Sequence, residues 1–315
     1  MRFLTYCLLF PLLFLLASPN TSFGQDSKLD QDVTTTEPDE YVIGITLANV
    51  GQIDRKNGEY FLDFWVYIES ENQDFIKNPP KLEFLNGQIN KISSEYVESE
   101  YYEARINGNF HNNMDFHNFP FEEITLKISI EPSIPQNIDR VRFSSDEFSS
   151  VIDDAANIPG WDMLKPEFMI VKHQYDDDTY SRFIVEYGAE KPILGTALRT
   201  LLPVTIITAI SLIIFFIPEN FTPRIYLTAP LLLALVYLHT SNLDYLPPLG
   251  YLTVFDKIMI IYYALFVNSI LTLGIQMRIH VTHKDDQKIK KVNNIQLILV
   301  PVIIVVGIIL FQMLD

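Results

Sequence analysis

The sequence predicts a β + α membrane protein, in which an N-terminal antiparallel β-sandwich is followed by a four-helix transmembrane bundle. Three observations lead to this fold class. Residues 25–198 hold 33 acidic and 14 basic residues, whereas the chain beyond them is almost uncharged outside short loops. The acidic part alternates β-branched and aromatic runs with turn residues, and the later part contains four long apolar segments. A length of 315 residues suits two domains, with a boundary near Leu198.

The first 24 residues have the composition of a signal peptide. Arg2 supplies the charged start, residues 8–17 form a short apolar core, and small residues precede Gln25, where we expect cleavage. The alternative is an uncleaved anchor helix, although the apolar core is short for a membrane span. The single cysteine, Cys7, lies here, so we expect a mature protein without disulfides or cysteine-metal sites. Residues 25–40 are acidic and threonine-rich, and we expect a disordered lead-in.

Residues 41–198 are predicted to form the β-sandwich. The turn residues 54–58, which include Asn-Gly, separate two strand signals and predict a hairpin. Further short strand signals are punctuated by proline and glycine, a pattern typical of antiparallel sandwiches. The predicted strands are 42–45, 60–68, 81–85, 101–106, 124–130, 141–143, 168–174 and 180–187.

Residues 199–315 are predicted to form the membrane domain, because they hold four apolar segments of about the twenty residues that cross a bilayer. The loop at 278–291, after the third segment, holds one arginine and four lysines. With an exported N-terminal domain this loop is cytoplasmic, in agreement with the positive-inside rule. We expect a multi-pass protein of a bacterial-type cell (inner) membrane with an extracellular N-terminal domain. The predicted spans are 201–217, 225–243, 258–276 and 295–313.

The second apolar segment differs from the other three because polar side chains interrupt it. Hydroxyl and imidazole groups at membrane depth are tolerated chiefly where they face protein or a water-filled space. We therefore predict that this helix lines a pore and that the rest of the chain controls its opening. The interrupting residues, within 223–254, are Tyr226, Thr228, Tyr237, His239 and Thr240.

Residues 115–122, Asp-Phe-His-Asn-Phe-Pro-Phe-Glu, resemble the Phe-Pro-Phe-Asp core of the Cys-loop in pentameric ligand-gated ion channels. The two cysteines of that family fall at Asn112 and Leu126, and their loss is similar to the prokaryotic members, which lack the disulfide. The resemblance covers residues 41–315 and implies an extracellular β-sandwich above a ligand-gated pore. Further landmarks in the family's order are Pro159-Gly160-Trp161, Leu202-Pro203, Leu246-Pro247, Tyr251-Leu252-Thr253 and Asp256.

The resemblance implies a homopentamer. Closed cyclic symmetry agrees with this, because side chains fill the core of one four-helix subunit and leave no ion path. Leu233 takes the place of the family's mid-pore leucine, where five leucines form a hydrophobic gate. The alternative is simple packing of Leu233 against a neighbouring helix, and a kink at Pro230 would shift the gate to Leu231 or Leu235. The resemblance makes six residues pore-facing: Tyr226, Pro230, Leu233, Tyr237, Thr240 and Asp244.

Rings of charge are expected to set ion selectivity. Glu219 is expected at the inner mouth and Asp244 near the outer one, and the acidic exported domain should concentrate cations. These features favour a cation-leaning pore for inorganic ions. Against them, Pro223 stands where many cation-conducting relatives carry a glutamate, and Arg224 lies at the inner mouth. The alternative for Glu219 is a solvated loop carboxylate.

Coupling between the two domains is also implied by the resemblance. Lys191 would lie between Asp54 and Glu122 in an ionic contact, and lysine in place of the family's arginine lacks the bidentate geometry. The alternative for Lys191 is an exposed lysine at the membrane interface. The other residues expected at this contact are Phe119, Pro120 and Phe121 of the sandwich, and Leu246, Pro247 and Pro248 after the pore helix.

The family's ligand site lies between subunits and is lined by aromatic side chains. The matching candidates are Phe148, Tyr175 and Tyr180, with Tyr102 contributed by the adjacent subunit. Such a box suits a cation, so the expected ligand is a small molecule or an ion. The alternative is that these are ordinary strand and loop aromatics. The family's Trp-x-Asp and Trp-x-Pro signatures are missing between residues 67 and 82, which separates this pocket from that of neurotransmitter receptors.

Metal and cofactor signals are weak. Asp176, Asp177 and Asp178 offer carboxylates that suit Ca²⁺, or they form a solvated hairpin tip, which we favour. His280 and His283 stand beside lysines without further ligands, so we expect no metal there and no cofactor.

Two other functional classes compete with a channel. A non-conducting membrane receptor or scaffold of the same fold is the second hypothesis, because tyrosines at the level of Tyr226 would narrow the path and Pro230 is unusual there. An exported enzyme is disfavoured, since the sequence has no Ser-His-Asp signature, His-Glu-x-x-His motif or phosphate-binding glycine loop. The expected partners are identical chains, the ligand, inorganic ions and the lipid bilayer, with no nucleic acid.

Overall fold

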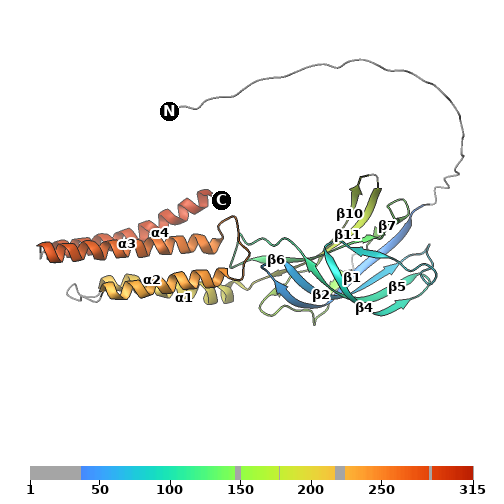
Figure 1. The fold of residues 1–315 in the computed structure, drawn as a ribbon, viewed down its shortest axis with the longest axis horizontal. Coiled ribbons are helices and arrows are strands. Elements are labelled where there is room, and N and C mark those ends of the chain that lie inside the picture. The colour runs from blue at the N-terminus through green and yellow to red at the C-terminus, as the bar shows by residue number, and fades with distance from the viewer. Residues whose placement is uncertain (1–36, 146–149, 177, 217–223, 284–285, 315) are drawn as a thin grey trace, which may run out of the picture. The chain divides into compact units, whose positions relative to one another are not determined.

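The computed structural model describes residues 37–145, 150–176, 178–216, 224–283 and 286–314. A β-rich region comes first in the chain, and helices follow it (Figure 1). The expected signal peptide, residues 1–24, lies outside the described residues, as do residues 25–36 of the expected lead-in. The first strand begins at Asp39, so the end of the predicted lead-in belongs to a sheet.

The larger sheet has the strand order β4-β5-β2-β1-β7, and β8 also pairs with β1. The pairs β1–β2, β2–β5 and β4–β5 are antiparallel, whereas β7 and β8 run parallel to β1. The sheet is therefore mixed rather than purely antiparallel, because the chain returns to β1 from the other sheet and not through a hairpin. Its strands are β1 (Asp39–Asp54), β2 (Glu59–Glu69), β4 (Gly87–Val97), β5 (Tyr101–His111), β7 (Val141–Ser144) and β8 (Ser150–Ile152).

The smaller sheet has the order β10-β11-β6-β3, with β9 beside β11. Its pairs are antiparallel, as predicted. The hairpin β10–β11 places Tyr175 opposite Asp178. The strands of this sheet are β3 (Leu82–Phe84), β6 (Glu123–Pro132), β9 (Asp162–Met163), β10 (Glu167–Tyr175) and β11 (Asp178–Glu190).

The turn between β1 and β2 confirms the hairpin predicted from residues 54–58. Asp54 accepts hydrogen bonds from the backbone N–H of Lys56, at 2.9 Å, and from the side-chain amide of Asn57, at 2.8 Å. Gly58 has φ +70°, and a Cβ there would lie 2.5 Å from the carbonyl oxygen of Asn112. Both the backbone conformation and the close approach therefore require glycine at this position.

One hydrophobic core fills the space between the two sheets and continues into the helical part, where Leu235 and Phe266 belong to it. β2 and β5 bury every second side chain over most of their length, which is the two-residue period of a strand. Each large aromatic in this core buries roughly 150–250 Å², so these rings supply much of the apolar area that holds the sheets face to face. The largest fully buried side chains come from both sheets and include Tyr60, Phe64, Phe110, Phe183 and Tyr187.

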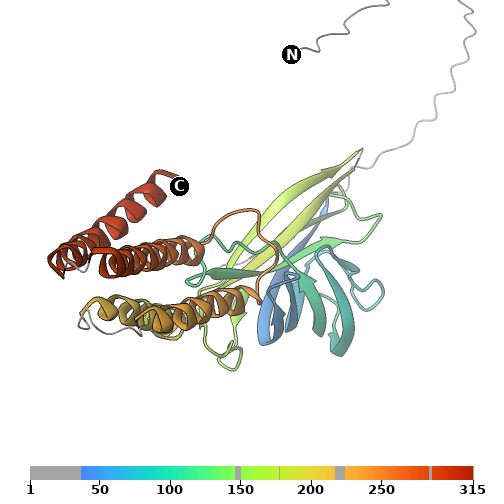
Figure 2. The same cartoon turned by 60° about the vertical axis from the view of Figure 1, so that its left-hand side comes forward.

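The helices are α1 (Ile193–Ile213), which the 3-10 turn η1 (Ile214–Phe216) extends, α2 (Arg224–Leu243), α3 (Val254–His283) and α4 (Asp286–Leu314). α1 packs against α2, and α3 packs against α4 (Figure 2). The prediction of a loop at 278–291 is wrong, because α3 continues to His283 and α4 begins at Asp286. Lysine, arginine and glutamine are good helix formers, so both helices extend beyond their apolar segments.

Buried amides join α3 to α4. Gln296 of α4 is 1% exposed and accepts hydrogen bonds from Asn268 and Thr272 of α3, each at 2.8 Å. Hydrogen bonds of this kind connect helices whose surroundings are apolar. They fix the register of α4 on α3 at this level.

Among the described residues, three helical segments are long and apolar enough to cross a membrane: Ile193–Ile213, Val254–Thr282 and Asp286–Met313. α2 is not among them, because tyrosine, threonine, histidine and asparagine side chains lower its mean hydropathy. The described part of the chain is thus a β-rich region followed by three apolar helices suited to a bilayer, as expected of a membrane protein.

Candidate functional site

One face of α2 is exposed along the helix in the described chain. Leu233 is 71% exposed and Tyr226 is 77% exposed. Residues spaced three and four apart lie along one side of a helix, so these side chains form one continuous surface. All six residues predicted to face a pore are exposed there: Tyr226, Pro230, Leu233, Tyr237, Thr240 and Asp244.

The two alternative gate positions turn toward the protein. Leu235 is fully buried in the hydrophobic core, and Leu231 is half-buried against it. The exposed residues before and after Pro230 follow the same three- and four-residue spacing, so the same face of the helix is exposed on both sides of the proline. Leu233 is therefore the only one of the three candidate gate leucines on the exposed face.

His239 lies on the inner side of α2 and links it to α3. Its Nδ1 is 2.9 Å from the Tyr263 hydroxyl, and its Nε2 is 2.9 Å from Oδ1 of Asp256. Thr228, 3% exposed, is also on the inner side. The polar residues read from the sequence as one stripe thus divide into two sets, and only Tyr226, Tyr237 and Thr240 lie on the exposed face.

The N-terminus of α3 is closed by a capping box. Oδ2 of Asp256 accepts a hydrogen bond from the backbone N–H of Thr253 at 2.9 Å. In return, the Thr253 hydroxyl accepts one from the backbone N–H of Asp256 at 3.1 Å. A helix leaves its first N–H groups without intrahelical partners, and this reciprocal pair satisfies two of them.

The next two N–H groups of α3 are satisfied by the loop that precedes β6. The N–H of Val254 donates to the carbonyl oxygen of His117, and the N–H of Phe255 donates to that of Phe119, each at 2.9 Å. Together with the capping box, these bonds give a partner to every backbone N–H of the first turn. The start of α3 is therefore built jointly by α3 and by the sheet region.

Ring contacts strengthen the same interface. His117 stacks on Tyr251 with ring centroids 3.7 Å apart and planes 5° from parallel. The Tyr251 hydroxyl accepts a hydrogen bond from the backbone N–H of Phe116 at 3.1 Å. Phe119 meets Phe255 edge to face at 5.7 Å. These contacts join residues 116–119 to residues 251–255.

The interface includes residues farther along the chain than those expected from the sequence. The expected partners of residues 119–121 were Leu246, Pro247 and Pro248, whereas Phe119 packs on Phe255. Leu246 is buried in the same hydrophobic core as Phe119 and Phe255, and Pro248 is exposed. The second half of the segment between α2 and α3 thus meets the loop, and the contact expected with Leu246 and Pro247 stays a prediction.

A buried carboxylate lies beside this interface. Glu122 is fully buried, and its Oε1 is 2.7 Å from Nη1 of Arg55 and 2.5 Å from Nζ of Lys191. The Lys191 ammonium also lies 5.0 Å from the centre of the Trp161 ring. Burial lowers the pKa of Lys191, and the charge of Glu122 opposes this change. The predicted Lys191–Glu122 contact is therefore present.

Asp54 was expected to join this ionic contact, but it does not. Its carboxylate accepts hydrogen bonds from the hairpin turn, and the side-chain amide of Asn57 is the main cause that lowers its pKa. Arg55, the next residue, takes the place beside Glu122. Two cations therefore face one carboxylate, where the resemblance implied one cation between two carboxylates.

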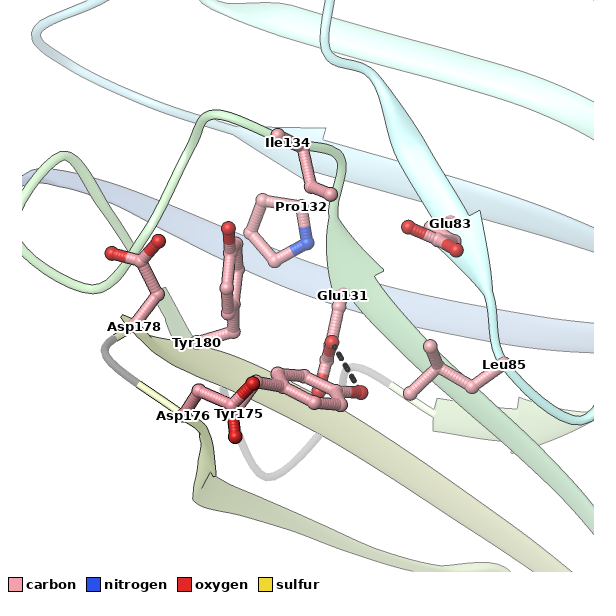
Figure 3. A pocket seen from close by; sticks show the side chains of 9 residues that line it. All are labelled: Glu83, Leu85, Glu131, Pro132, Ile134, Tyr175, Asp176, Asp178 and Tyr180. Atoms are coloured by element: carbon pink, nitrogen blue, oxygen red, sulfur yellow. Dashed lines mark hydrogen bonds between the residues drawn. The ribbon is translucent and has the colours of Figure 1, made fainter.

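A cavity of about 510 Å³ contains two of the predicted ligand-binding tyrosines (Figure 3). Tyr175 and Tyr180 meet edge to face at 5.8 Å. Glu131, 3% exposed, accepts hydrogen bonds from the Tyr175 hydroxyl at 3.2 Å and from Nε of Arg182 at 2.7 Å. The other acidic residues of the lining are Glu83, Asp176 and Asp178.

The remaining predicted ligand residues do not join this cavity in the described chain. Tyr102 is 5% exposed, belongs to the hydrophobic core and donates a hydrogen bond to Glu95 at 2.9 Å. Its side chain is therefore part of the core of its own chain. Phe148, Asp177 and Glu219 lie outside the described residues. Within those residues, no group of three histidine, cysteine or carboxylate side chains is arranged to hold a metal ion.

Sequence reasoning missed several residues of the interface. Thr253 and Asp256 have the Thr-x-x-acid spacing of a capping box, so the start of α3 was readable. Arg55 and Phe255 carried no such signal, because which side of a turn or helix meets another domain depends on packing.

The chain matches no protein-family model and no curated protein.

Proposed function

We propose that this chain is one subunit of a pentameric ligand-gated ion channel, similar to the prokaryotic members that lack the Cys-loop disulfide. In this proposal the β-rich domain is exported and α2 lines a cation-leaning pore. The observation that carries the proposal is the face of α2 that stays exposed in the single chain and coincides with all six expected pore positions.

The polar character of that face supports assembly around water. Lipid accepts an apolar helix surface, but hydroxyl and carboxylate groups at membrane depth need protein or water beside them. Tyr237 and Thr240 lie on the exposed face of α2, whereas α1, α3 and α4 expose mainly aliphatic side chains. A ring of identical chains would turn α2 inward and the other helices toward lipid, with closed cyclic symmetry.

Leu233 is the proposed gate. Its side chain is 71% exposed, while Leu231 and Leu235 pack within the subunit. Five leucines at one level of a narrow pore would exclude water and so block ions without filling the path. Rotation or tilting of α2 would remove this constriction.

Cation preference is supported by charge. Asp244 is exposed just beyond the C-terminal end of α2, and residues 25–198 carry a large excess of acidic side chains. A vestibule of this sign would raise the local concentration of cations. Glu219 remains a predicted selectivity residue, outside the described part of the chain.

The proposed route from ligand to pore runs through the first turn of α3. Residues 116–119 hold that turn by hydrogen bonds and ring stacking, and His239 connects α3 to α2. The cavity with Tyr175 and Tyr180 is the proposed ligand site, where aromatic rings and carboxylates suit a cationic small molecule or ion. A displacement of the loop would reach α2 through these contacts.

Reconstitution of the full-length protein in liposomes tests the proposal. We expect cation flux, measured by a fluorescent indicator or by bilayer recording, to appear on addition of a cationic ligand and to depend on Tyr180. Tyr180→Ala should shift the half-maximal ligand concentration, whereas Met169→Ala, at an exposed position on the neighbouring strand, should not. Flux that is absent across a ligand, pH and Ca²⁺ screen contradicts a channel.

A non-conducting receptor or scaffold is the second candidate, and the exposure of Tyr226 favours it. Five tyrosine side chains at the narrow end of a pore would occupy much of its cross-section. Flux in Tyr226→Ala but not in the unaltered protein would indicate a plugged channel. No flux in either protein, with ligand binding retained, would indicate a receptor that signals without conducting.

A further inference from the structure

A small cavity lies next to the start of α1, and its lining includes both cations that pair with Glu122. Its volume is about 240 Å³, below the usual size of a site for a drug-sized molecule and suited to one small polar group. We call it the cationic cavity. Its lining residues are Gly51, Ile53, Arg55, Ile158, Trp161 and Lys191.

The cationic cavity carries an excess of positive charge. Arg55 and Lys191 share one oxygen, Oε1 of Glu122, and among the described residues no other carboxylate forms an ion pair with either cation. Burial lowers the pKa of Lys191, Glu122 opposes this change, and Arg55 adds to it. A second anion beside Lys191 would therefore favour its charged form.

Both cations keep hydrogen-bond donors that an anion can reach. A guanidinium group has five N–H donors and an ammonium group has three, and each of these side chains donates one hydrogen bond within the described chain, to Glu122. Neither side chain is enclosed, because that of Arg55 is 21% exposed and that of Lys191 is 19% exposed. Donors from two cations on one cavity wall suit a phosphate or carboxylate group.

The surroundings of the cavity indicate that this anion belongs to a lipid. Lys191 comes two residues before α1, which is long and apolar enough to cross a membrane. The Trp161 ring lies 5.0 Å from the Lys191 ammonium, and the Tyr245 ring lies 6.0 Å from the Arg55 guanidinium. Tryptophan and tyrosine rings, and lysine side chains near helix ends, are typical of the depth at which lipid headgroups meet water.

An apolar surface on α1 continues from the same place. Leu194 is 73% exposed, Leu198 is 51% exposed and Leu202 is 45% exposed. These residues are four apart, so they lie along one side of the helix, and we call them the leucine stripe. The stripe begins three residues after Lys191. A hydrocarbon chain would gain free energy by covering it, whereas a soluble anion would gain nothing from it.

We propose that the cationic cavity binds the phosphate group of an anionic phospholipid, which accepts hydrogen bonds from Arg55 and Lys191. One acyl chain of the same lipid lies along the leucine stripe. An anionic headgroup balances the excess positive charge, whereas a zwitterionic headgroup brings a further cation. The site requires that α1 stands in a bilayer, but it does not require that α2 lines a pore or that the protein conducts ions.

Native mass spectrometry of the full-length protein in detergent, titrated with phosphatidylglycerol, counts the lipids bound per subunit. We expect one lipid per subunit at the tightest site. Arg55→Gln should weaken this binding about tenfold, as the loss of a hydrogen bond between charged groups does, while Lys191 still neutralises Glu122. The control Lys56→Gln removes the same charge from the next residue, which is exposed and outside the cavity lining, and should keep the affinity. Equal weakening in both variants would overturn the proposal.

Variants on α1 test the acyl chain and leave the ion pair intact. Leu198→Ser should weaken phosphatidylglycerol binding several-fold, because it places a hydroxyl in the leucine stripe. Ile213→Ser is the control, since Ile213 is also exposed on α1 but lies about 22 Å farther along the helix. The same affinity in these two variants would contradict a lipid chain along the stripe.

The headgroup is tested with three other probes. Diacylglycerol, which has no phosphate, and phosphatidylcholine, which is zwitterionic, should each bind more weakly than phosphatidylglycerol. Diacylglycerol bound as tightly as phosphatidylglycerol would show that the two cations take no part. Inorganic phosphate that displaces phosphatidylglycerol at equal concentration would assign the cavity to a soluble anion and overturn the lipid.

Discussion

At the scale of single residues, the most consequential group is the carboxylate of Glu122. It is fully buried, and it faces the two cations of Arg55 and Lys191. Its other oxygen, Oε2, has no hydrogen-bond partner among the described residues. Removing one partner of a buried ion pair leaves an uncompensated charge in a low-dielectric site. The main contribution of Glu122 to stability is therefore that its charge compensates those of Arg55 and Lys191.

Glu122→Gln should destabilise the protein by about 3–5 kcal/mol, because Arg55 and Lys191 would keep their charges without a counter-ion. Thermal denaturation of the purified protein measures this as a lower midpoint. Glu123→Gln changes the next residue, which is exposed. This variant should change the free energy of unfolding by no more than about 0.5 kcal/mol, so its midpoint should stay close to that of the unaltered protein. Equal midpoints for the two variants would show that the buried pair contributes nothing.

Asp115 should make the stability of the interface depend on acid. The backbone N–H of His117 is the main cause that lowers the pKa of Asp115 below its ordinary value of 3.8. A carboxyl with a lowered pKa in the folded state contributes stability above its unfolded pKa, and this is lost as the pH falls through the folded pKa. Between about pH 5 and about pH 2.5, Asp115→Asn should therefore lose less thermal stability than the unaltered protein.

Asp139→Asn is the matched control for that acid titration. Asp139 is exposed, and the described residues give its side chain no hydrogen bond, so its variant should follow the unaltered protein. An Asp115→Asn profile that also follows the unaltered protein would mean that the bond to His117 does not differ between folded and unfolded states.

At the scale of elements, α2 divides its residues between two environments. Its outer side carries leucine, tyrosine and threonine, while Leu235 enters the hydrophobic core and His239 bonds to α3. In an amphipathic helix of this kind, packing within the subunit constrains only the side chains of the inner face. Substitutions on the two sides should therefore have different effects.

Leu233→Thr should ease opening, because a ring of hydroxyl groups holds water where leucines exclude it. We expect flux at lower ligand concentration, or without ligand, with little change in thermal stability. Leu235→Thr should instead lower stability by about 2–5 kcal/mol, as core truncations do, and should not promote flux. Eased opening by Leu235→Thr but not by Leu233→Thr would place the gate on the other register.

The elements that the sequence predicted well are those with one dominant period. β2 and β5 alternate buried and more exposed residues, and β2 was predicted to within one residue at each end, whereas β5 continues five residues beyond its predicted end. β4 was missed because it lies at the edge of its sheet with serine, lysine and glutamate on both faces and two irregularities in its pairing. Edge strands of this kind carry little hydrophobic signal.

The candidate site was predictable where it depended on helix period, and less so where two distant segments meet. The family resemblance gave the starting point of the count along α2, and helix period then gave the other positions of its exposed face. Tyr102 was assigned to a ligand site, but the alternation of β5 turns it into the core. The choice of Arg55 over Asp54 depends on the twist of one hairpin, which no local pattern specifies.

At the scale of the whole chain, acidic sheets and apolar helices meet through a small set of directional contacts. Hydrogen bonds, one stacked ring pair and one buried carboxylate connect residues 116–122 to α3 and to the segment before α1. The outer face of α2, with Tyr226, Leu233 and Tyr237, is meanwhile mostly exposed. In the proposed function, other copies of the chain surround that face in the bilayer.

Native mass spectrometry of the detergent-solubilised protein should therefore give the mass of five processed chains. The reason is that, in the proposed function, five inward-turned α2 helices would enclose a path that one subunit lacks. Negative-stain images should show the same five-fold ring. A monomer that stays a monomer in nanodiscs would contradict both the pore and the gate assigned to Leu233.

The two bonds from Val254 and Phe255 to the carbonyl oxygens of His117 and Phe119 also bear on how movement begins. A backbone N–H that loses its acceptor beside a bilayer finds little water to bond to instead. Arrangements in which these hydrogen bonds are stretched but not yet replaced are therefore the highest in free energy. The loop and the start of α3 should then either keep both hydrogen bonds or lose both at once. Single-molecule records would accordingly show abrupt jumps between two levels instead of a graded drift.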